Sequence, residues 1–178
     1  MPESTTVFAG VTIPSTHPLF LAILAVHVPL GLFAVVTGVA AMLSRKAPGR
    51  HPRFGTMYFW SLGGVFVSAT ALSAMRWAEA YHLFVLGAIA FAAAILGRGA
   101  RRRRRPGWEV RHIAFMGASY VVMLTAFYVD NGKQLPLWRE LPAWTYWVIP
   151  ALVGAPIIAW ALLRHPLVKR AREPGKAS

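Results

Sequence analysis

Cysteine is absent from this chain of 178 residues. Its absence excludes disulfide bonds, thiolate metal sites and thiol nucleophiles. The common metal or cofactor ligands left in number are the six histidines. Any cofactor site in this protein is therefore expected to use histidine.

Charged residues are few and mostly of one sign. They make up 14% of the chain, with 19 Lys and Arg against 6 Asp and Glu, whereas 56% of the residues are hydrophobic. With a mean hydropathy of +0.49, the chain is too apolar for an ordinary soluble domain. Because the basic residues lie at the ends of apolar runs, we expect no nucleic-acid partner.

Catalytic motifs are also missing. The sequence contains no Gly-rich phosphate loop, no Ser/His/Asp arrangement, no His-x-x-x-His pair and no carboxylate dyad. Hydrolase and kinase chemistry are not indicated, and a non-enzymatic role is favoured. The first ten residues lack a basic segment and include Glu3, so we expect no cleavable signal peptide.

Five apolar runs are long enough to cross a bilayer, which takes about 20 residues at 1.5 Å per residue. The predicted helices span residues 18–43, 56–76, 80–97, 111–130 and 144–163, with basic loops at 44–55 and 98–110 and a tail at 164–178. The third is short unless residues 77–80 add a turn. The sequence predicts an all-α integral membrane helical bundle forming a single transmembrane domain. Two apolar pairs separated by basic loops loosely resemble a repeat, but too weakly to predict one.

Basic residues set the expected orientation. Of the 19, 16 fall in the two loops and the tail or immediately beside them. The positive-inside rule then places both loops and the C-terminus in the cytoplasm and the N-terminus outside. A bacterial cytoplasmic (inner) membrane, crossed several times, is the expected location. Aromatic residues are expected at interfacial depth, Tyr58 and Trp60 at the start of the second helix and a belt of Trp138, Trp144, Tyr146 and Trp147 before the fifth.

One ionisable residue lies well inside an apolar run. His27 is expected roughly 13 Å below the outer boundary, where ionisable groups are costly and often functional. Pro29 frees a nearby carbonyl that can accept a hydrogen bond from the imidazole. His27 is thus either a neutral histidine bonded within the bundle or a cofactor ligand.

Four histidines fall into two groups by depth. His27 and His82 are expected in the outer half, and His51 and His112 in the inner half. Facing histidines near each surface are typical of membrane cytochromes that hold haem b. His82 is expected about two turns shallower than His27, so the inner pair is better matched. The alternative for His51 and His112 is capping or headgroup contact at the interface.

Polar residues from several helix ends meet at the outer rim. These residues are Arg76, Glu79, His82, Asp130 and Asn131, to which we add His27 and Tyr120 as residues that face a cavity. They are expected either to bind a small polar ligand or to pair structurally. We predict a basic side chain within about 4 Å of the Asp130 carboxylate, the range in which a charge partner matters.

Two further partners are expected from surface composition. The run Arg101–Arg105 is typical of a topogenic signal and is expected to bind anionic lipid headgroups, at about 1 kcal/mol per charge. Small and hydroxylated residues in the second and fourth helices permit close helix packing. A membrane-protein partner, with this chain as an accessory or scaffold subunit, is therefore an alternative function.

Four segments carry a resemblance to a known family. They are GRHPRFGTMYFW, MRWAEAYHLF, RHIAFMGASYVVMLTAFYVDNG and LPLWRELPAWTYWVIP. Together they resemble the bacterial membrane-protein family DUF2306, a domain of unknown function, over about residues 20–165. The resemblance implies a multi-span membrane protein and supplies no activity or catalytic residues. Three functions stay open: a ligand- or cofactor-binding bundle, a b-type cytochrome-like electron-transfer protein, and a scaffold subunit.

Overall fold

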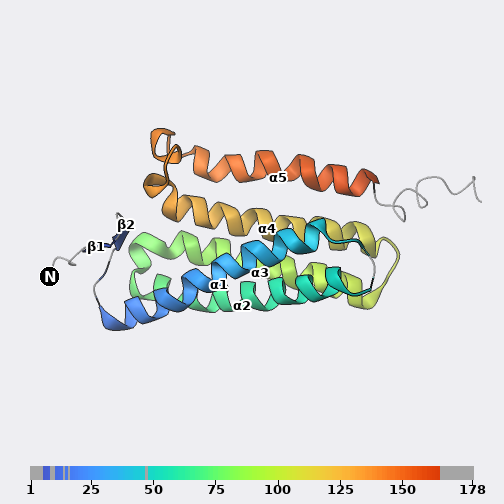
Figure 1. Ribbon diagram of the computed structural model, residues 1–178, viewed down its shortest axis with the longest axis horizontal. Helices are drawn as coiled ribbons and strands as arrows, with labels where there is room; N and C mark the ends of the chain where they lie inside the picture. The colour runs from blue at the N-terminus through green and yellow to red at the C-terminus, as the bar shows by residue number, and fades with distance from the viewer. Residues whose placement is uncertain (1–5, 9–10, 14, 16, 47, 165–178) are drawn as a thin grey trace, which may run out of the picture.

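A computed structural model describes residues 6–8, 11–13, 15, 17–46 and 48–164. Its helices are α1 (Pro18–Leu43), α2 (Arg50–Met75), α3 (Trp77–Arg103), α4 (Trp108–Asn131) and α5 (Thr145–Arg164). The chain reverses direction after each helix, so the five lie side by side (Figure 1). All five are long and apolar enough to span a membrane, which confirms the predicted number of spans.

The helices extend further than the apolar runs. α1 has the predicted bounds, whereas α2 begins at Arg50 instead of residue 56 and α3 covers Trp77–Arg103 instead of 80–97. Arginine is a good helix former, and its long side chain can reach water or headgroups from a helix end. The predicted loops 44–55 and 98–110 are therefore partly helical.

Two short strands precede the helices and were not predicted. β1 (Thr6–Phe8) pairs antiparallel with β2 (Val11–Ile13), with Thr6 opposite Ile13. β-branched and aromatic residues dominate both, which favours extended backbone.

The helices pack as neighbours in chain order. α1 packs mainly on α2, α3 on α4 and α2 on α3, while α5 packs on α4. The core combines three alanines of α1 and α3 with larger side chains of α2 and α4: Ala34, Ala90, Ala94, Tyr58, Leu62 and Met123. Small residues let the helix backbones approach closely, so packing rather than large apolar side chains defines this core.

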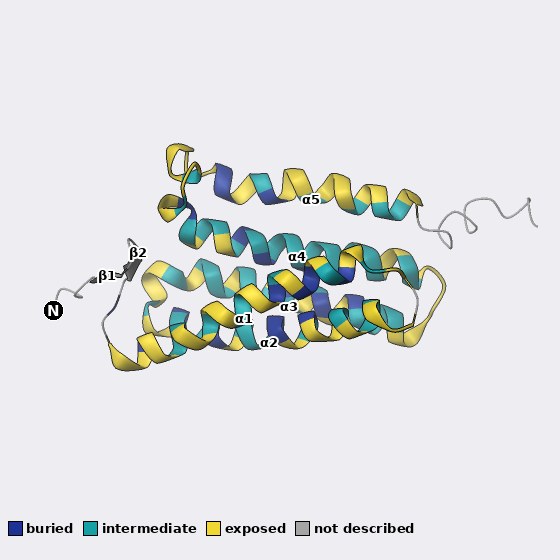
Figure 2. Cartoon of the chain, in the orientation of Figure 1, coloured by how far each residue is buried: buried dark blue, intermediate teal, exposed yellow. Residues whose placement is uncertain are grey.

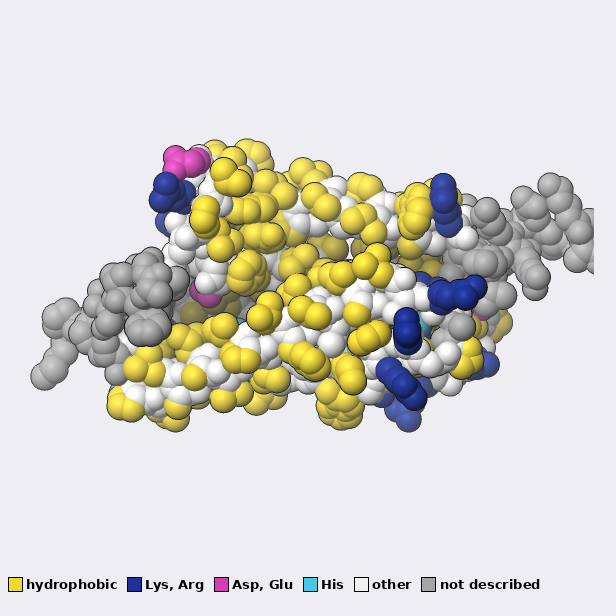
Figure 3. Space-filling model, viewed as in Figure 1, with side chains coloured by type: hydrophobic (Ala, Val, Ile, Leu, Met, Phe, Trp, Pro, Cys, Tyr) yellow, Lys and Arg dark blue, Asp and Glu magenta, His cyan; other side chains and the backbone are white. Residues whose placement is uncertain are grey.

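Exposed residues occur along the whole length of the bundle (Figure 2), and many of them are large and apolar. Leu32, Trp60 and Val67 are 65%, 67% and 69% exposed. Figure 3 shows a mainly apolar middle zone, with charged side chains at the two ends. A surface of this kind is stable in hydrocarbon and unstable in water. The molecule is a multi-pass membrane protein.

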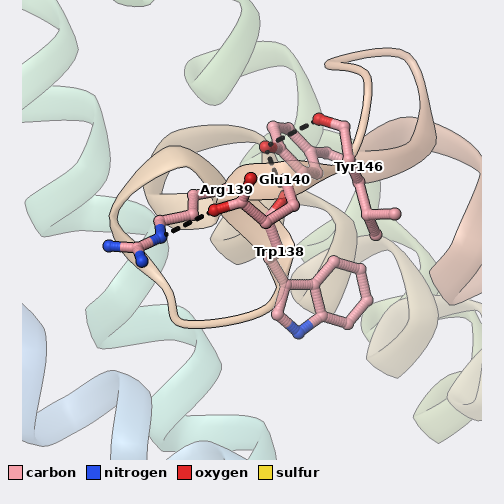
Figure 4. A network of polar contacts seen from close by, with 5 residues as sticks. Trp138, Arg139, Glu140 and Tyr146 are labelled. Carbon is pink, nitrogen blue, oxygen red and sulfur yellow. Dashed lines mark hydrogen bonds and ion pairs between the residues drawn. The ribbon is translucent and has the colours of Figure 1, made fainter.

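The aromatic residues divide between the core and the surface. Tyr58 was expected at the interface but is only 2% exposed, because the earlier start of α2 places it about 12 Å into the helix. Tyr146 is also buried, and its hydroxyl donates to the Trp138 carbonyl at 2.9 Å (Figure 4). That bond fixes the connection from α4 to α5. Trp144 and Trp147 remain exposed.

The helix pairs α1–α2 and α3–α4 resemble an internal repeat in two residue patterns. On α1, the buried residues Ala34, Gly38 and Ala41 follow a four-then-three spacing, and Ala90, Ala94 and Gly97 follow it on α3. On α2 and α4 the pattern Arg-His-x-x-Phe occurs at 50–54 and again at 111–115. Each equivalent pair on α2 and α4 is 61 residues apart, as Tyr58 and Ser119 are.

Residues at matching positions of α2 and α4 contact each other. Tyr58 bonds to its own equivalent, Ser119, at 2.9 Å, and the ring of His51 contacts that of its equivalent, His112. The sequence analysis did not link these positions, because few residues are identical between the two helix pairs.

Candidate functional site

The inner histidine pair, His51 and His112, joins α2 and α4 by a ring contact. His51 stands in the first turn of α2 and His112 near the start of α4. Their ring centroids are 6.3 Å apart and the ring planes are nearly perpendicular, at 86°. Both side chains are half-buried. The structure thus brings together the inner pair that the sequence singled out.

Backbone carbonyls fix the tautomer of both rings. His51 Nδ1 lies 2.9 Å from the Ala41 carbonyl oxygen, and His112 Nδ1 lies 2.9 Å from that of Gly97. A carbonyl only accepts, so each Nδ1 carries the proton and donates. Each Nε2 then has a lone pair for a metal, the arrangement common among metal-binding histidines. Ala41 and Gly97 are themselves equivalent in the two repeats, so both histidines are held in the same way.

Positive charge surrounds the inner histidine pair. Lys46 and Arg101 both act electrostatically on His51 and on His112. Within the described residues, no group of three or more His, Cys, Asp or Glu side chains is placed to hold a metal ion. The site therefore offers two imidazoles with cations nearby.

His27 ties α1 to α2. Its Nδ1 lies 2.8 Å from the Ser68 hydroxyl oxygen. The Ser68 hydroxyl donates to backbone carbonyls of its own helix, including Gly64 at 2.8 Å, so its oxygen is left to accept from the imidazole. The partner of His27 is thus a hydroxyl of the neighbouring helix instead of a carbonyl freed by Pro29. The imidazole of His27 is therefore hydrogen-bonded within the bundle.

Asp130 has basic electrostatic neighbours on other parts of the bundle. It lies exposed at the end of α4, and no basic nitrogen of the described residues is within 4 Å of its carboxylate. The predicted close ion pair is therefore absent from the described part of the chain. His27, His82 and Arg76 nevertheless act electrostatically on Asp130, from α1, from α3 and from the α2–α3 junction. Figure 3 shows a recess toward this end of the molecule, with an acidic side chain at its edge.

The other predicted outer residues have local partners. Glu79 pairs with Arg76 three residues earlier and is 63% exposed. Asn131 donates to Asp130 at 3.2 Å and to the Phe127 carbonyl at 3.1 Å. Tyr120 lies about 15 Å deeper than Asp130 along α4, where its hydroxyl donates to the Val35 carbonyl. Asn131 therefore contacts Asp130 directly, whereas Glu79 pairs with Arg76 and Tyr120 bonds to α1.

His27 and His82, the outer histidines considered as haem ligands, are not in ring contact as His51 and His112 are. His82 lies against the rings of Tyr81 and Trp147, with centroids 5.8 Å and 6.0 Å away. Among the ring contacts between described residues, none joins His27 to His82. The two histidines instead share Asp130 as an electrostatic neighbour.

Sequence reasoning missed two partners at these sites. Ser68 was interpreted as a packing hydroxyl but bonds His27, and Tyr58 was assigned to the interface but bonds Ser119 of α4. The repeated Arg-His-x-x-Phe pattern is the signal that would have linked Tyr58 to Ser119. Comparisons with protein-family models, curated proteins and solved structures found no match for this chain.

Proposed function

We propose that this chain is a non-enzymatic protein of the bacterial inner membrane that binds a cofactor inside its bundle, at the inner histidine pair. The observation that supports this best is the pairing of His51 with His112, each with Nδ1 bonded to a carbonyl. We place the N-terminus outside and the C-terminus in the cytoplasm, because the basic residues favour that orientation. The likeness to DUF2306 is part of the same proposal.

Haem b is the cofactor that we propose. Zinc usually takes three or four protein ligands, whereas haem iron needs only one or two beyond the porphyrin nitrogens. His51 and His112, whose ring centroids are 6.3 Å apart, would hold the haem iron through their imidazoles. Lys46 and Arg101 would offset the charge of the propionates. When bound, haem supplies one-electron chemistry, and the role is then that of a b-type cytochrome.

An absorption spectrum tests this proposal. The protein, purified in detergent and supplied with haemin, should show a Soret band that shifts on reduction with dithionite. His51→Ala and His112→Ala should each abolish or strongly alter the band. His27→Ala and His82→Ala are matched controls in the same bundle and should retain it. A protein that binds no haem, or four variants with one common spectrum, would overturn the proposal.

A second candidate is a polar ligand site around Asp130. The observation that favours it is a carboxylate near three basic groups but without a close ion pair among the described residues. An open carboxylate at a membrane surface can bind a cation or the cationic end of a small ligand. Sodium chloride should then stabilise the protein thermally more than choline chloride does. Asp130→Asn should remove the difference, and Glu79→Gln, also at the outer end, should retain it.

A further inference from the structure

The connection from α4 to α5 holds an exposed leucine in a strained backbone conformation. Leu137 has a φ of 69° and a ψ of −43°, close to the values of a classic γ-turn, which is rare and strained. Its side chain is 84% exposed. In water, neither the positive φ nor the exposure of so large an apolar side chain is favourable for leucine.

The residue after Leu137 holds this backbone in place. The ring of Trp138 stacks on Tyr128 of α4, with ring centroids 4.2 Å apart. Its carbonyl accepts a hydrogen bond from the Tyr146 hydroxyl of α5 at 2.9 Å (Figure 4). Strained backbone persists only where its surroundings fix it. Trp138 is thus bound to both helices, and Leu137 beside it is kept in its exposed position.

The connection lies at the level of the helix ends. In Figure 1 the start of α1 extends further outward along the bundle than the connection between α4 and α5 does. Exposed aromatic side chains occur at this end of the helices, among them Trp77, Tyr81 and Trp144. Such side chains prefer the headgroup region, so they mark the depth of the membrane surface. The connection is therefore at the depth of the lipid headgroups.

We infer that this connection is an interfacial anchor, with Leu137 and Leu141 inserted among the lipids of the nearer leaflet. Between these two leucines lies the exposed ion pair of Arg139 and Glu140, which suits the headgroup layer. Burial of a leucine in hydrocarbon stabilises by about as much as one strained residue destabilises. Because α5 packs mainly on α4, the anchor would also fix the depth of α5. The inference is independent of haem binding and of the proposed orientation.

A fluorescent probe at Leu137 tests the inference, because the chain has no native cysteine. Leu137→Cys is labelled with the fluorophore NBD, and the full chain is reconstituted in vesicles of phosphatidylethanolamine and phosphatidylglycerol. Nitroxide lipids labelled near the headgroup should quench this probe, and iodide on both sides should quench it several-fold less than a probe at Lys133→Cys. Lys133 is the matched control, since it is exposed in the same connection and charged.

A probe at Leu141→Cys separates anchoring from simple contact. Iodide should quench it more strongly in a Leu137→Asn background than in a Leu137→Met background, because asparagine tolerates the positive φ but not hydrocarbon. Equal quenching in the two backgrounds would show that Leu137 does not anchor the segment. Iodide quenching of the Leu137 probe as strong as that of the Lys133 probe would place the segment in water, and shielding from both quenchers would mean that another protein chain covers it. Each of these three results would overturn the inference, and none would change the haem spectrum.

Discussion

Hydrogen bonds of individual side chains stabilise the packing of α1, α2 and α4. Ser119 donates to the Met116 carbonyl at 2.8 Å, so its oxygen accepts from the Tyr58 hydroxyl. Tyr120 packs against Tyr58 with ring centroids 5.9 Å apart and reaches α1 through the Val35 carbonyl. Without water in the hydrocarbon, such groups must find partners inside the protein.

Tyr58→Phe should destabilise the bundle slightly. The variant removes the hydroxyl that donates to Ser119, and cross-helix hydrogen bonds in membranes contribute about 0.6 kcal/mol on average, with a maximum of about 1.7 kcal/mol. Thermal unfolding in detergent should show a small decrease in midpoint. Tyr81→Phe, at an exposed tyrosine, is the control and should melt like the parent protein. Equal melting of both variants would contradict the assigned role of Tyr58.

Gly38→Ala should lower the stability of the protein more than Tyr58→Phe does. The new methyl group would lie 2.5 Å from the Tyr120 ring. Overpacking of this kind typically costs about 1–3 kcal/mol. Gly31→Ala on the same helix is the matched control, since its Cβ would meet nothing within 4 Å. Unfolding measured in detergent should separate the two substitutions clearly. A Gly38→Ala protein as stable as the Gly31→Ala protein would show that Tyr120 can move away freely.

Whole helices are held by different numbers of neighbours. α3 packs on both α2 and α4, whereas the main contacts of α5 are with α4. The attachment of α5 depends on glycines of α4 and α5 that admit side chains of the other helix, and on Tyr146 at the connection. Close approach at small residues replaces the hydrophobic driving force that is missing between helices in lipid.

Gly117→Ala should loosen α5 from α4, because its Cβ would lie 2.6 Å from Ile158. The loss of stability should be partly recovered when Ile158→Ala is added. A double-mutant cycle on thermal stability should therefore give a coupling energy of about 0.5–3 kcal/mol. Gly55→Ala, whose Cβ would meet nothing, should show no coupling to Ile158→Ala. If the stability losses of Gly117→Ala and Ile158→Ala were additive, Gly117 and Ile158 would not be in contact.

At the scale of the whole molecule, charge divides the two ends. The ends of α1, α3 and α5 and the starts of α2 and α4 carry most of the arginine and lysine. The opposite end mixes Arg76, Lys133 and Arg139 with Glu79, Asp130 and Glu140. This division is the basis of the proposed orientation.

Fusion reporters should give opposite results at the two ends. Green fluorescent protein fused after Ser178 should fluoresce, and alkaline phosphatase fused after Lys133 should be active, if the basic end is cytoplasmic. An active phosphatase after Ser178 would reverse the topology. The control exchanges the two reporters. Alkaline phosphatase after Ser178 should then be inactive, and green fluorescent protein after Lys133 should not fluoresce.

Anionic lipid should bind at the basic end. Replacing Arg101–Arg105 by glutamine should weaken the binding of phosphatidylglycerol, because each basic charge contributes about 1 kcal/mol of attraction at the surface. Native mass spectrometry should then show less retained lipid. The orientation should survive, because the remaining basic residues still favour the same side. Replacement of Arg76, Lys133 and Arg139 is the control at the other end. Unchanged lipid retention would remove the proposed lipid site.

Much of the architecture followed from the sequence. Hydropathy is a local property, so five spans could be predicted from runs of neighbouring residues, and α1 was placed residue for residue. Helix ends beyond the apolar runs were missed, since arginines at 50 and 101–103 were interpreted as loop although they continue a helix. His51 and His112 were paired by depth alone.

The sequence by itself determined the medium, because long apolar runs are stable only in hydrocarbon. Only the tertiary structure decided which groups meet across helices: Ser68 with His27 over 41 positions, Ser119 with Tyr58 over 61, and Val35 with Tyr120 over 85. Such meetings depend on helix rotation and crossing, which small residues at the contacts set and which local hydropathy does not encode. The contact between His51 and His112 likewise follows from that packing.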